Sequence, residues 1–205
     1  MTRLILVRHG ETIWNVDRRF QGQSDIGLNV RGEQQAELTA QRLSDEAIEA
    51  VYSSDLQRCL ETAGIIARDR GLAVRARPEL REINFGEWEG MTFQEISTHS
   101  PGYLDRMRAD TESVRPPGGE TWAEVQQRVD AIFGEIRHAH PIGIVLVVSH
   151  VNPLRVLICS LLGCVLSQMF RVRWSNCGVS IVEVGPSGGT ILLLNDDCHV
   201  RGLKL

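Results

Sequence analysis

The stretch LVRHGETIWN, residues 6–15, ends an apolar run with a basic side chain and an imidazole. Residues 3–7 read RLILV, which is typical of a buried strand, and Gly10 marks a turn directly after it. Arg8 and His9 are therefore predicted to stand side by side where that strand ends. Such a pair is either a solvated turn or part of a site for an anion, and the other segments decide between the two.

Strands and helices alternate along the rest of the chain. Further strands are predicted at residues 50–54, 72–76 and 143–150, and helices at 29–43, 55–67 and from 121 onward. The runs VSIVEV and TILLLN, joined by the turn GPSGG, are typical of a terminal hairpin. Continuous apolar strands separated by helices indicate a mainly parallel sheet covered on both faces. The expected fold class is therefore a three-layer α/β/α arrangement.

Capping residues mark the predicted helix starts. Asp55 is the expected N-cap of the second helix, and Asn152 that of the helix after residue 150, with Pro153 at its first position. Two capping boxes are expected, Thr92 with Glu95 and Thr121 with Glu124. In the helix that follows Thr121, a single apolar stripe predicts packing on the sheet; it comprises Val125, Val129, Ile132 and Ile136.

The chain length fits one domain, and the interpretation is a single domain over residues 1–205. Residues 81–120 break the alternation of strands and helices and hold two short helices at most. We expect this segment to be an insertion that lies over the sheet edge as a lid.

The composition excludes several classes of function. With a net charge of −4, the chain has no general attraction for nucleic acid or an anionic membrane. The apolar run Leu4–Val7 is too short for a signal peptide or a membrane span. The five cysteines are odd in number and scattered, without a C-x-x-C pair, which argues against a disulfide framework or a zinc site. A cytoplasmic protein is the expectation.

Basic and imidazole groups converge on one predicted edge of the sheet. His9 and His150 each follow a strand directly, and Arg58 lies in the first helical turn after another strand. In parallel sheets, ligands bind beyond the carboxyl ends of the strands. Each residue alone is more often a turn or surface residue, but their common location favours an anion site.

This set of residues suits a phosphate ester. An imidazole nitrogen can attack phosphorus, and two guanidiniums with a second, protonated imidazole can hold the phosphoryl oxygens. The leaving alkoxide needs a proton, which a carboxylic acid of raised pKa can supply. Glu82 is the candidate because Ile83 and Phe85 offer an apolar setting. On the pattern alone the alternatives stay open; they are Glu79, Glu87 and Glu89.

Other phosphate chemistries lack their motifs in this chain. There is no G-x-x-x-x-G-K-[ST] loop, no cysteine with an arginine six residues later, and no D-x-D stretch for magnesium. Neither a metal nor a cofactor is expected.

The motif LVRHGET followed by Asn15 resembles the signature of the histidine phosphatase superfamily, which has the phosphoglycerate mutase-like fold. The resemblance runs along the whole chain. It continues in RFQGQSDIGLNVRGEQQA, VYSSDLQRCLETA, LREINFGEWEG, PPGGET and VVSHVNPLR, in the family's order. A single R-H-G motif is moderately specific, whereas this ordered series is highly specific.

The resemblance implies a role for each matching residue. His9 would be the phosphorylated nucleophile and Glu82 the acid-base residue. The phosphate pocket and the substrate loop would be formed by Arg8, Arg58, His150, Asn15, Gln21 and Gly22. The family uses no metal.

Within the family, the short chain and the stretch INFGEWEG favour a phosphatase over a cofactor-dependent mutase. NFGEWEG and the tail LNDDCHV are similar to the α-ribazole phosphatases and their broad-specificity relatives. The alternatives are a phosphoglycerate mutase and a metal-independent phosphoserine phosphatase, which is expected to carry His at the position of Phe85. A non-catalytic phosphate-binding protein should lack His9, Glu82 or an arginine, and all of these are present.

The expected partner is a small-molecule phosphate ester, with α-ribazole 5′-phosphate the best single candidate. Aromatic side chains of the lid region would suit a flat, base-like group; they are Phe85, Trp88, Phe93, Tyr103 and Trp122. For a carboxylate-bearing ester, the nearby cations are Arg106, Arg108 and Arg115. The terminal hairpin offers an edge for a homodimer.

Overall fold

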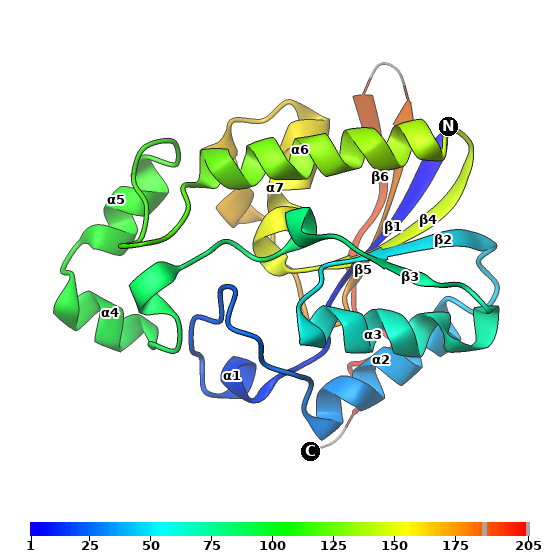
Figure 1. The fold of residues 1–205 in the computed structure, drawn as a ribbon, viewed down its shortest axis with the longest axis horizontal. Coiled ribbons are helices and arrows are strands. Elements are labelled where there is room, and N and C mark those ends of the chain that lie inside the picture. The colour runs from blue at the N-terminus through cyan, green and yellow to red at the C-terminus, as the bar shows by residue number, and fades with distance from the viewer. Residues whose placement is uncertain (186–187, 204–205) are drawn as a thin grey trace.

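The computed structural model describes residues 1–185 and 188–203 and is built on one six-stranded sheet (Figure 1). Its strands are β1 (Thr2–Arg8), β2 (Ile48–Ser53), β3 (Val74–Ala76), β4 (Gly143–Ser149), β5 (Val179–Gly185) and β6 (Gly188–Asp196). The order across the sheet is β3-β2-β4-β1-β5-β6. β1 to β4 run parallel, β5 is antiparallel to β1, and β6 is antiparallel to β5. The mainly parallel α/β sheet is confirmed.

The predicted terminal hairpin is present as β5 and β6. Residues 186–187, the centre of its GPSGG turn, lie outside the described residues.

Helices cover both faces of the sheet, so the three layers are also confirmed. In Figure 1, α6 and α7 lie above the sheet, α2 and α3 lie below it, and α4 and α5 extend from one end. The helices are α1 (Ile13–Val16), α2 (Val30–Arg42), α3 (Gln57–Ala67), α4 (Phe93–His99), α5 (Tyr103–Ala109), α6 (Trp122–Ala139) and α7 (Val151–Leu162). Short 3₁₀ turns are Arg68–Arg70, Pro78–Leu80, Gly86–Trp88 and Leu166–Arg171.

The side-chain alternation of β1 divides the core into two layers. Leu4 and Leu6 pack into the cluster that contains the α6 and α7 side chains, whereas Ile5 and Val7 pack into the cluster on the α2 and α3 side. All four side chains are buried. Burying each such side chain stabilises the fold by about 1.5–3 kcal/mol. The predicted stripe of α6 faces the first of these clusters.

Both predicted capping boxes are confirmed. At the start of α4, the Thr92 side chain accepts from the Glu95 N–H and the Glu95 carboxylate accepts from the Thr92 N–H. Thr121 and Glu124 make the same reciprocal pair at the start of α6. Each box satisfies two backbone donors that the first helical turn leaves free.

Two predicted N-caps are wrong. The N-cap of α3 is Leu56, because the Asp55 carboxylate is engaged by the Arg81 guanidinium instead. The Gln57 N–H of that helix is bound by the carboxylate of Asp25, which comes from a distant loop.

The N-cap of α7 is His150 rather than Asn152. Asn152 lies inside the first turn, and Pro153 takes the third helical position instead of the predicted first. Gly163 ends the helix in a left-handed conformation, as a stop signal predicts.

The segment 81–120 contains a 3₁₀ turn, α4 and α5, and extends from one end of the sheet (Figure 1). Its inner side chains join the α6–α7 cluster; they include Ile83, Trp88, Ile96 and Met107. The segment is therefore packed on the same core as the sheet. No helix in the described parts of the chain combines the length and apolar character needed to cross a membrane.

Candidate active site

The two predicted histidines meet because β1 and β4 are neighbours in the sheet. Arg8 pairs with Ser149 in the parallel register, and the His9 N–H donates to the Ser149 carbonyl at 3.0 Å. The chain turns at Gly10, where a Cβ atom would come within 2.5 Å of the Gly32 carbonyl oxygen. The His9 and His150 ring centroids lie 5.2 Å apart. Strand pairing alone thus brings the two imidazoles together.

The His9 ring is held with one nitrogen free. Its Nδ1 lies 2.7 Å from the Gly10 carbonyl oxygen, an acceptor, so Nδ1 carries the proton and Nε2 has the lone pair. Burial, followed by the charges of Arg58 and Arg8, lowers the pKa of His9 well below its ordinary value. A neutral imidazole with an unprotonated Nε2 is the form that attacks an electrophile.

His150 is fixed by hydrogen bonds at both nitrogens. Its Nδ1 accepts from Arg58 Nε at 3.3 Å, so Nε2 carries the proton and donates to Ser54 Oγ at 2.9 Å. Burial, followed by the Arg58 charge, lowers the pKa of His150 well below its ordinary value. These contacts fit a neutral imidazole; the protonated form expected from the sequence concerns the state with a phosphoryl group bound.

Arg58 comes from the first turn of α3 and shapes the loop that follows α1. Its guanidinium donates to the carbonyls of Gly22 and Ser24, at 2.7 and 2.8 Å. On the other side of the loop, the Glu89 carboxylate accepts from the Gln23 N–H and the Ser24 hydroxyl. Gly22 has a φ of +51°, and a side chain there would overlap the Glu89 carboxylate. The loop is thus clamped between a cation and a carboxylate.

Arg8 has a donor to spare. One terminal nitrogen donates to the Trp174 carbonyl at 2.7 Å, whereas Nε is buried without a partner among the described residues. Burial lowers the pKa of Arg8 to about 10, which leaves the side chain charged at neutral pH. A buried, charged donor without a partner is costly unless a ligand supplies the acceptor.

Asn15 and Gln21 complete the polar wall. The Asn15 amide oxygen accepts from the Thr12 N–H and from the Asn176 side chain, which leaves its amide nitrogen to donate to a ligand. The Gln21 side-chain oxygen is buried and has no partner among the described residues.

Glu82 is the carboxyl group that faces this set. It is 6% exposed, and Ile83 and Phe85 beside it are also buried. Burial raises the pKa of Glu82, against the opposing effects of the Ile83 N–H, the Arg58 charge and a hydrogen bond from Asn152. The apolar setting predicted for Glu82 is present, and its raised pKa suits a proton donor.

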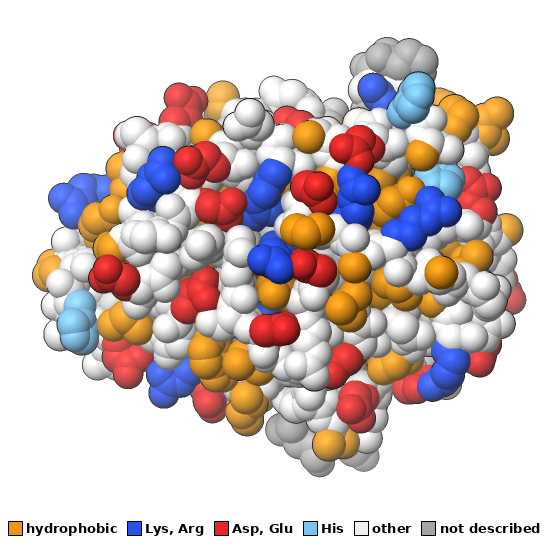
Figure 2. Space-filling model, viewed as in Figure 1, with side chains coloured by type: hydrophobic (Ala, Val, Ile, Leu, Met, Phe, Trp, Pro, Cys, Tyr) orange, Lys and Arg blue, Asp and Glu red, His pale blue; other side chains and the backbone are white. Residues whose placement is uncertain are grey.

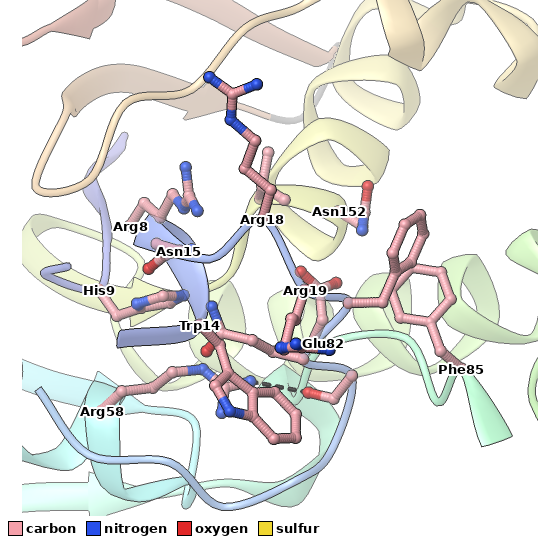
Figure 3. Close-up of a pocket in the computed structure, with 14 residues that line it drawn as sticks. Arg8, His9, Trp14, Asn15, Arg18, Arg19, Arg58, Glu82, Phe85 and Asn152 are labelled. Atoms are coloured by element: carbon pink, nitrogen blue, oxygen red, sulfur yellow. Dashed lines mark hydrogen bonds between the residues drawn. The ribbon is translucent and has the colours of Figure 1, made fainter. Parts of the chain in front are cut away.

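These groups surround one pocket of about 280 Å³ (Figure 3). Seven of the eight predicted site residues line it: Arg8, His9, Asn15, Gln21, Gly22, Arg58 and Glu82. His150 lies directly behind, in contact with Arg58. Six further lining residues were not predicted as site residues; they are Trp14, Arg18, Arg19, Phe20, Val151 and Asn152. The adjacent pair Arg18-Arg19, just after the first motif, was the signal that could have revealed two of them.

The pocket holds more positive than negative charge, with four arginines and a single carboxylate in its wall. By contrast, the face of the molecule in Figure 2 shows acidic and basic side chains interspersed. The concentration of positive charge inside the pocket suits an anionic ligand.

A second pocket of about 200 Å³ adjoins the first and shares four lining residues with it, among them Phe20, Phe85 and Asn152. Its remaining wall is mostly apolar and includes Leu104, Met107, Trp122 and Phe170. Two cations, Arg108 and Arg155, also line it. A group attached to an anion in the first pocket would extend into this space.

The aromatic residues expected to recognise a flat group mostly pack on one another. Trp88 is buried against Tyr103, with ring centroids 5.0 Å apart, and Phe93 is half exposed. Phe85 lines both pockets, and Trp122 lines the second.

The cations named for a carboxylate are also mostly engaged elsewhere. Arg106 lies over the Tyr103 ring and Arg115 pairs with Glu124. Arg108 lines the second pocket, together with Arg155, which the sequence analysis did not consider. Within residues 1–185 and 188–203, no three His, Cys, Asp or Glu side chains gather as metal ligands.

The sequence and the fold were compared with those of known proteins. The family model of the histidine phosphatase superfamily (branch 1) matches residues 4–197. Phosphoserine phosphatase 1 of Hydrogenobacter thermophilus is 38% identical over 200 residues, covering 98% of this chain and 95% of that protein. A probable phosphoglycerate mutase GpmB of Erwinia tasmaniensis is 40% identical over 89% of this chain and 85% of its own length. The α-ribazole phosphatase structure from Shigella flexneri superposes with a TM-score of 0.87 at 30% identity, covering 95% of this chain and 96% of that one.

Proposed function

The chain belongs to branch 1 of the histidine phosphatase superfamily and is a phosphatase; from that premise we propose that it hydrolyses small phosphate monoesters through a phosphohistidine formed on His9. The observation that carries the proposal is the state of His9. Its Nδ1 is held by the Gly10 carbonyl, so its Nε2 is free in a pocket where Arg8 Nε has no partner among the residues that the structure describes. A phosphoryl group would supply the missing acceptor and the electrophile together.

In the first step, His9 Nε2 attacks phosphorus, and a P–N bond forms as the ester P–O bond breaks. The electron pair of the broken bond goes to the leaving oxygen. Glu82, whose pKa is raised by burial, gives that oxygen its proton and is left as a carboxylate. The alcohol then leaves.

In the second step, a water molecule attacks the phosphohistidine. The Glu82 carboxylate takes a proton from that water as the new P–O bond forms. The P–N bond breaks, its electron pair returns to His9 Nε2, and inorganic phosphate is released. Glu82 is protonated again, so both residues end in their starting state.

The fixed charges of the pocket stabilise the transferred group. Arg8 and Arg58 hold the phosphoryl oxygens, and their positions are set by the Trp174 carbonyl and by the loop carbonyls. His150 is neutral here, and a phosphate dianion beside it would raise its pKa toward the protonated form. Asn15 adds a neutral donor from the pocket wall.

For the substrate, we keep α-ribazole 5′-phosphate as the first candidate within a broad range of small esters. The support is the largely apolar second pocket next to the phosphate site, which fits a flat or hydrophobic alcohol. The structural likeness to an α-ribazole phosphatase points the same way.

A second candidate is a carboxylate-bearing ester such as phosphoserine or phosphoglycerate. Arg18 and Arg19 at the phosphate pocket, and Arg155 in the adjoining one, offer cations beyond those that a phosphate needs. The likeness to a phosphoserine phosphatase and to a probable phosphoglycerate mutase also favours this candidate.

Brief reaction with a ³²P-labelled ester tests the mechanism. With EDTA present, we expect label on the protein that is stable to base and lost in acid, and we expect vanadate to block turnover. Dependence on added magnesium, or label of the opposite stability, would refute the proposal. Adding bisphosphoglycerate distinguishes a mutase, because only a mutase would then interconvert phosphoglycerates faster than it releases phosphate.

A panel of substrates tests the choice of ester. The ratio kcat/KM is compared for α-ribazole 5′-phosphate, phosphoserine, 3-phosphoglycerate and a nucleoside monophosphate. A hundredfold preference for a carboxylate-bearing ester, about 2.7 kcal/mol in the transition state, would replace the first candidate by the second.

A further inference from the structure

In the segment that carries Glu82, a single guanidinium binds three backbone carbonyls. Arg128, on α6, donates to the carbonyl oxygens of Glu79, Arg81 and Glu82, at 2.7, 2.6 and 3.0 Å. Its Nε and remaining Nη2 donor bind the two carboxylate oxygens of Glu120, at 3.0 and 3.1 Å. A guanidinium has five N–H groups, so these bonds use all of them.

Glu120 extends the clamp to the other side of Glu82. Its Oε2 accepts from the Asn84 N–H at 2.8 Å, and its own N–H donates to the Asn84 carbonyl at 2.9 Å. The Arg128–Glu120 pair therefore binds backbone groups both before and after Ile83. The two side chains are 17% and 23% exposed, so the pair is largely shielded from water.

The carbonyl between these contacts is bound as well. The Leu80 carbonyl oxygen accepts from the Ser149 hydroxyl at 2.7 Å, at the end of β4. Four consecutive carbonyls, those of residues 79–82, thus bind side chains of α6 or β4. Because this segment is not paired in the sheet, these carbonyls would otherwise be hydrogen-bonded only by water. The side-chain contacts therefore also fix the course of the backbone.

We propose that Arg128, aligned by Glu120, is the positioning residue for the acid Glu82: it fixes the path of residues 79–84 and so the place of the carboxyl group beside the leaving oxygen. This inference rests on the proposed role of Glu82. A shift of the acid by about 1 Å is enough to reduce proton transfer strongly. Arg128 does not line the phosphate pocket, so phosphate binding is untouched by this role.

The test uses Arg128→Lys in the full-length enzyme. Lys keeps the positive charge, which also acts on His150, but a single ammonium cannot bind three carbonyls and a carboxylate. Two esters are compared: glycerol 2-phosphate, whose alkoxide needs a proton, and p-nitrophenyl phosphate, whose leaving group hardly does. We expect kcat on glycerol 2-phosphate to fall about 30-fold or more, with less than a threefold change on p-nitrophenyl phosphate and in KM. Glu120→Gln should also lower kcat more on glycerol 2-phosphate than on p-nitrophenyl phosphate, with a smaller difference between the two esters.

The matched control is Arg77→Lys. The Arg77 side chain also joins α6, through Glu135, and pairs with the Glu79 carboxylate, but it has no hydrogen bond to a carbonyl of residues 79–82 among the described residues. It should leave both rates within twofold. The proposal would be overturned if Arg128→Lys lowered kcat equally on both esters. It would also be overturned if Arg77→Lys showed the same difference between the esters as Arg128→Lys.

A double variant separates this inference from the function on which it rests. In a Glu82→Gln background, Arg128→Lys should cost nothing further on glycerol 2-phosphate, because the acid it positions is gone. A full additional loss would show that Arg128 acts by another route. If Glu82→Gln alone produces no split between the esters, the assignment of the acid fails, whatever Arg128 does.

If Arg128→Lys does not fold, Glu120→Gln alone decides. It keeps the shape and the donor-binding oxygen of the glutamate and removes the charge that aligns the guanidinium. Absence of the split in Glu120→Gln would then count against the proposal.

Discussion

The two sides of the pocket are held in different ways. On the nucleophile side, the His9 N–H continues the β1–β4 ladder through the Ser149 carbonyl. On the acid side, Glu82 lies in a segment outside any strand, and side chains from α6 and β4 bind its carbonyls. The proposed nucleophile is therefore placed by backbone pairing, and the proposed acid by distant side chains. Substitutions far from the pocket should disturb the acid side much more than the nucleophile side.

Removing the nucleophile should have the largest effect. His9→Ala is expected to lower kcat at least about a thousandfold, or about 4 kcal/mol, on both alkyl and aryl phosphates, because no other group can carry the phosphoryl. The fold should survive, since the ladder contact at residue 9 is made by the backbone. Steady-state kinetics and circular dichroism check this, with exposed His138→Ala as the control. Residual activity above a thousandth of wild type would remove His9 from the mechanism.

Removing the acid should give a loss that depends on the leaving group. Glu82→Gln is expected to lower kcat on glycerol 2-phosphate by about 10² to 10³ and on p-nitrophenyl phosphate by less than about tenfold. In wild type, the alkyl rate should also fall as pH rises through the raised pKa of Glu82, while the aryl rate should not follow it. A plot of log kcat against leaving-group pKa measures the difference. Parallel losses on both esters would mean that Glu82 only positions substrate.

The buried histidines should make the fold sensitive to acid. Burial lowers the pKa of His9 in the folded protein well below the ordinary value of about 6.5, so between these two pKa values only the unfolded chain takes up the proton. The free energy of unfolding should fall there by about 1.4 kcal/mol per pH unit for this group. Glu82, whose pKa is raised, acts oppositely, because its contribution is lost as pH rises. The difference between wild type and His9→Ala, from urea unfolding at pH 5, 6 and 7, isolates the histidine; parallel curves would contradict the expectation.

The segment 81–120 should contribute the smallest and most selective effect. Phe85 lines both pockets, so Phe85→Leu is expected to lower kcat/KM for bulky aromatic esters about three- to tenfold and to leave glycerol 2-phosphate within twofold. Phe93, half exposed in the same segment, supplies the control Phe93→Leu. A change of the same size on every ester would assign Phe85 to packing rather than to substrate selection.

Much of the nucleophile side could be predicted from the sequence, since a strand end is a local signal. An apolar run followed by R-H-G places His9, and the same logic places His150 and Arg58 on that edge. The sheet, its layers and the capping boxes follow from hydrophobic periodicity and short-range polar pairs.

The rest depends on partners that are distant in the sequence. Asp55 fails as an N-cap because Arg81 competes for its carboxylate. Arg128 looks like an ordinary polar position on an amphipathic helix, because the carbonyls it binds lie 46 to 49 residues away. Asn152 satisfies a capping pattern, yet its amide acts on Glu82. Local sequence propensity cannot predict which of these long-range contacts form.

The sheet order has a consequence for how the protein is made. β4 (Gly143–Ser149) lies between β1 and β2, although these end far earlier in the chain, at Arg8 and Ser53. A nascent chain that has not reached residue 143 leaves the place between β1 and β2 vacant, with apolar strand edges exposed. The Ser149 carbonyl that anchors His9 is absent until the same moment. Catalytic competence should therefore arise late in synthesis and abruptly, so that truncated products are inactive and prone to aggregate.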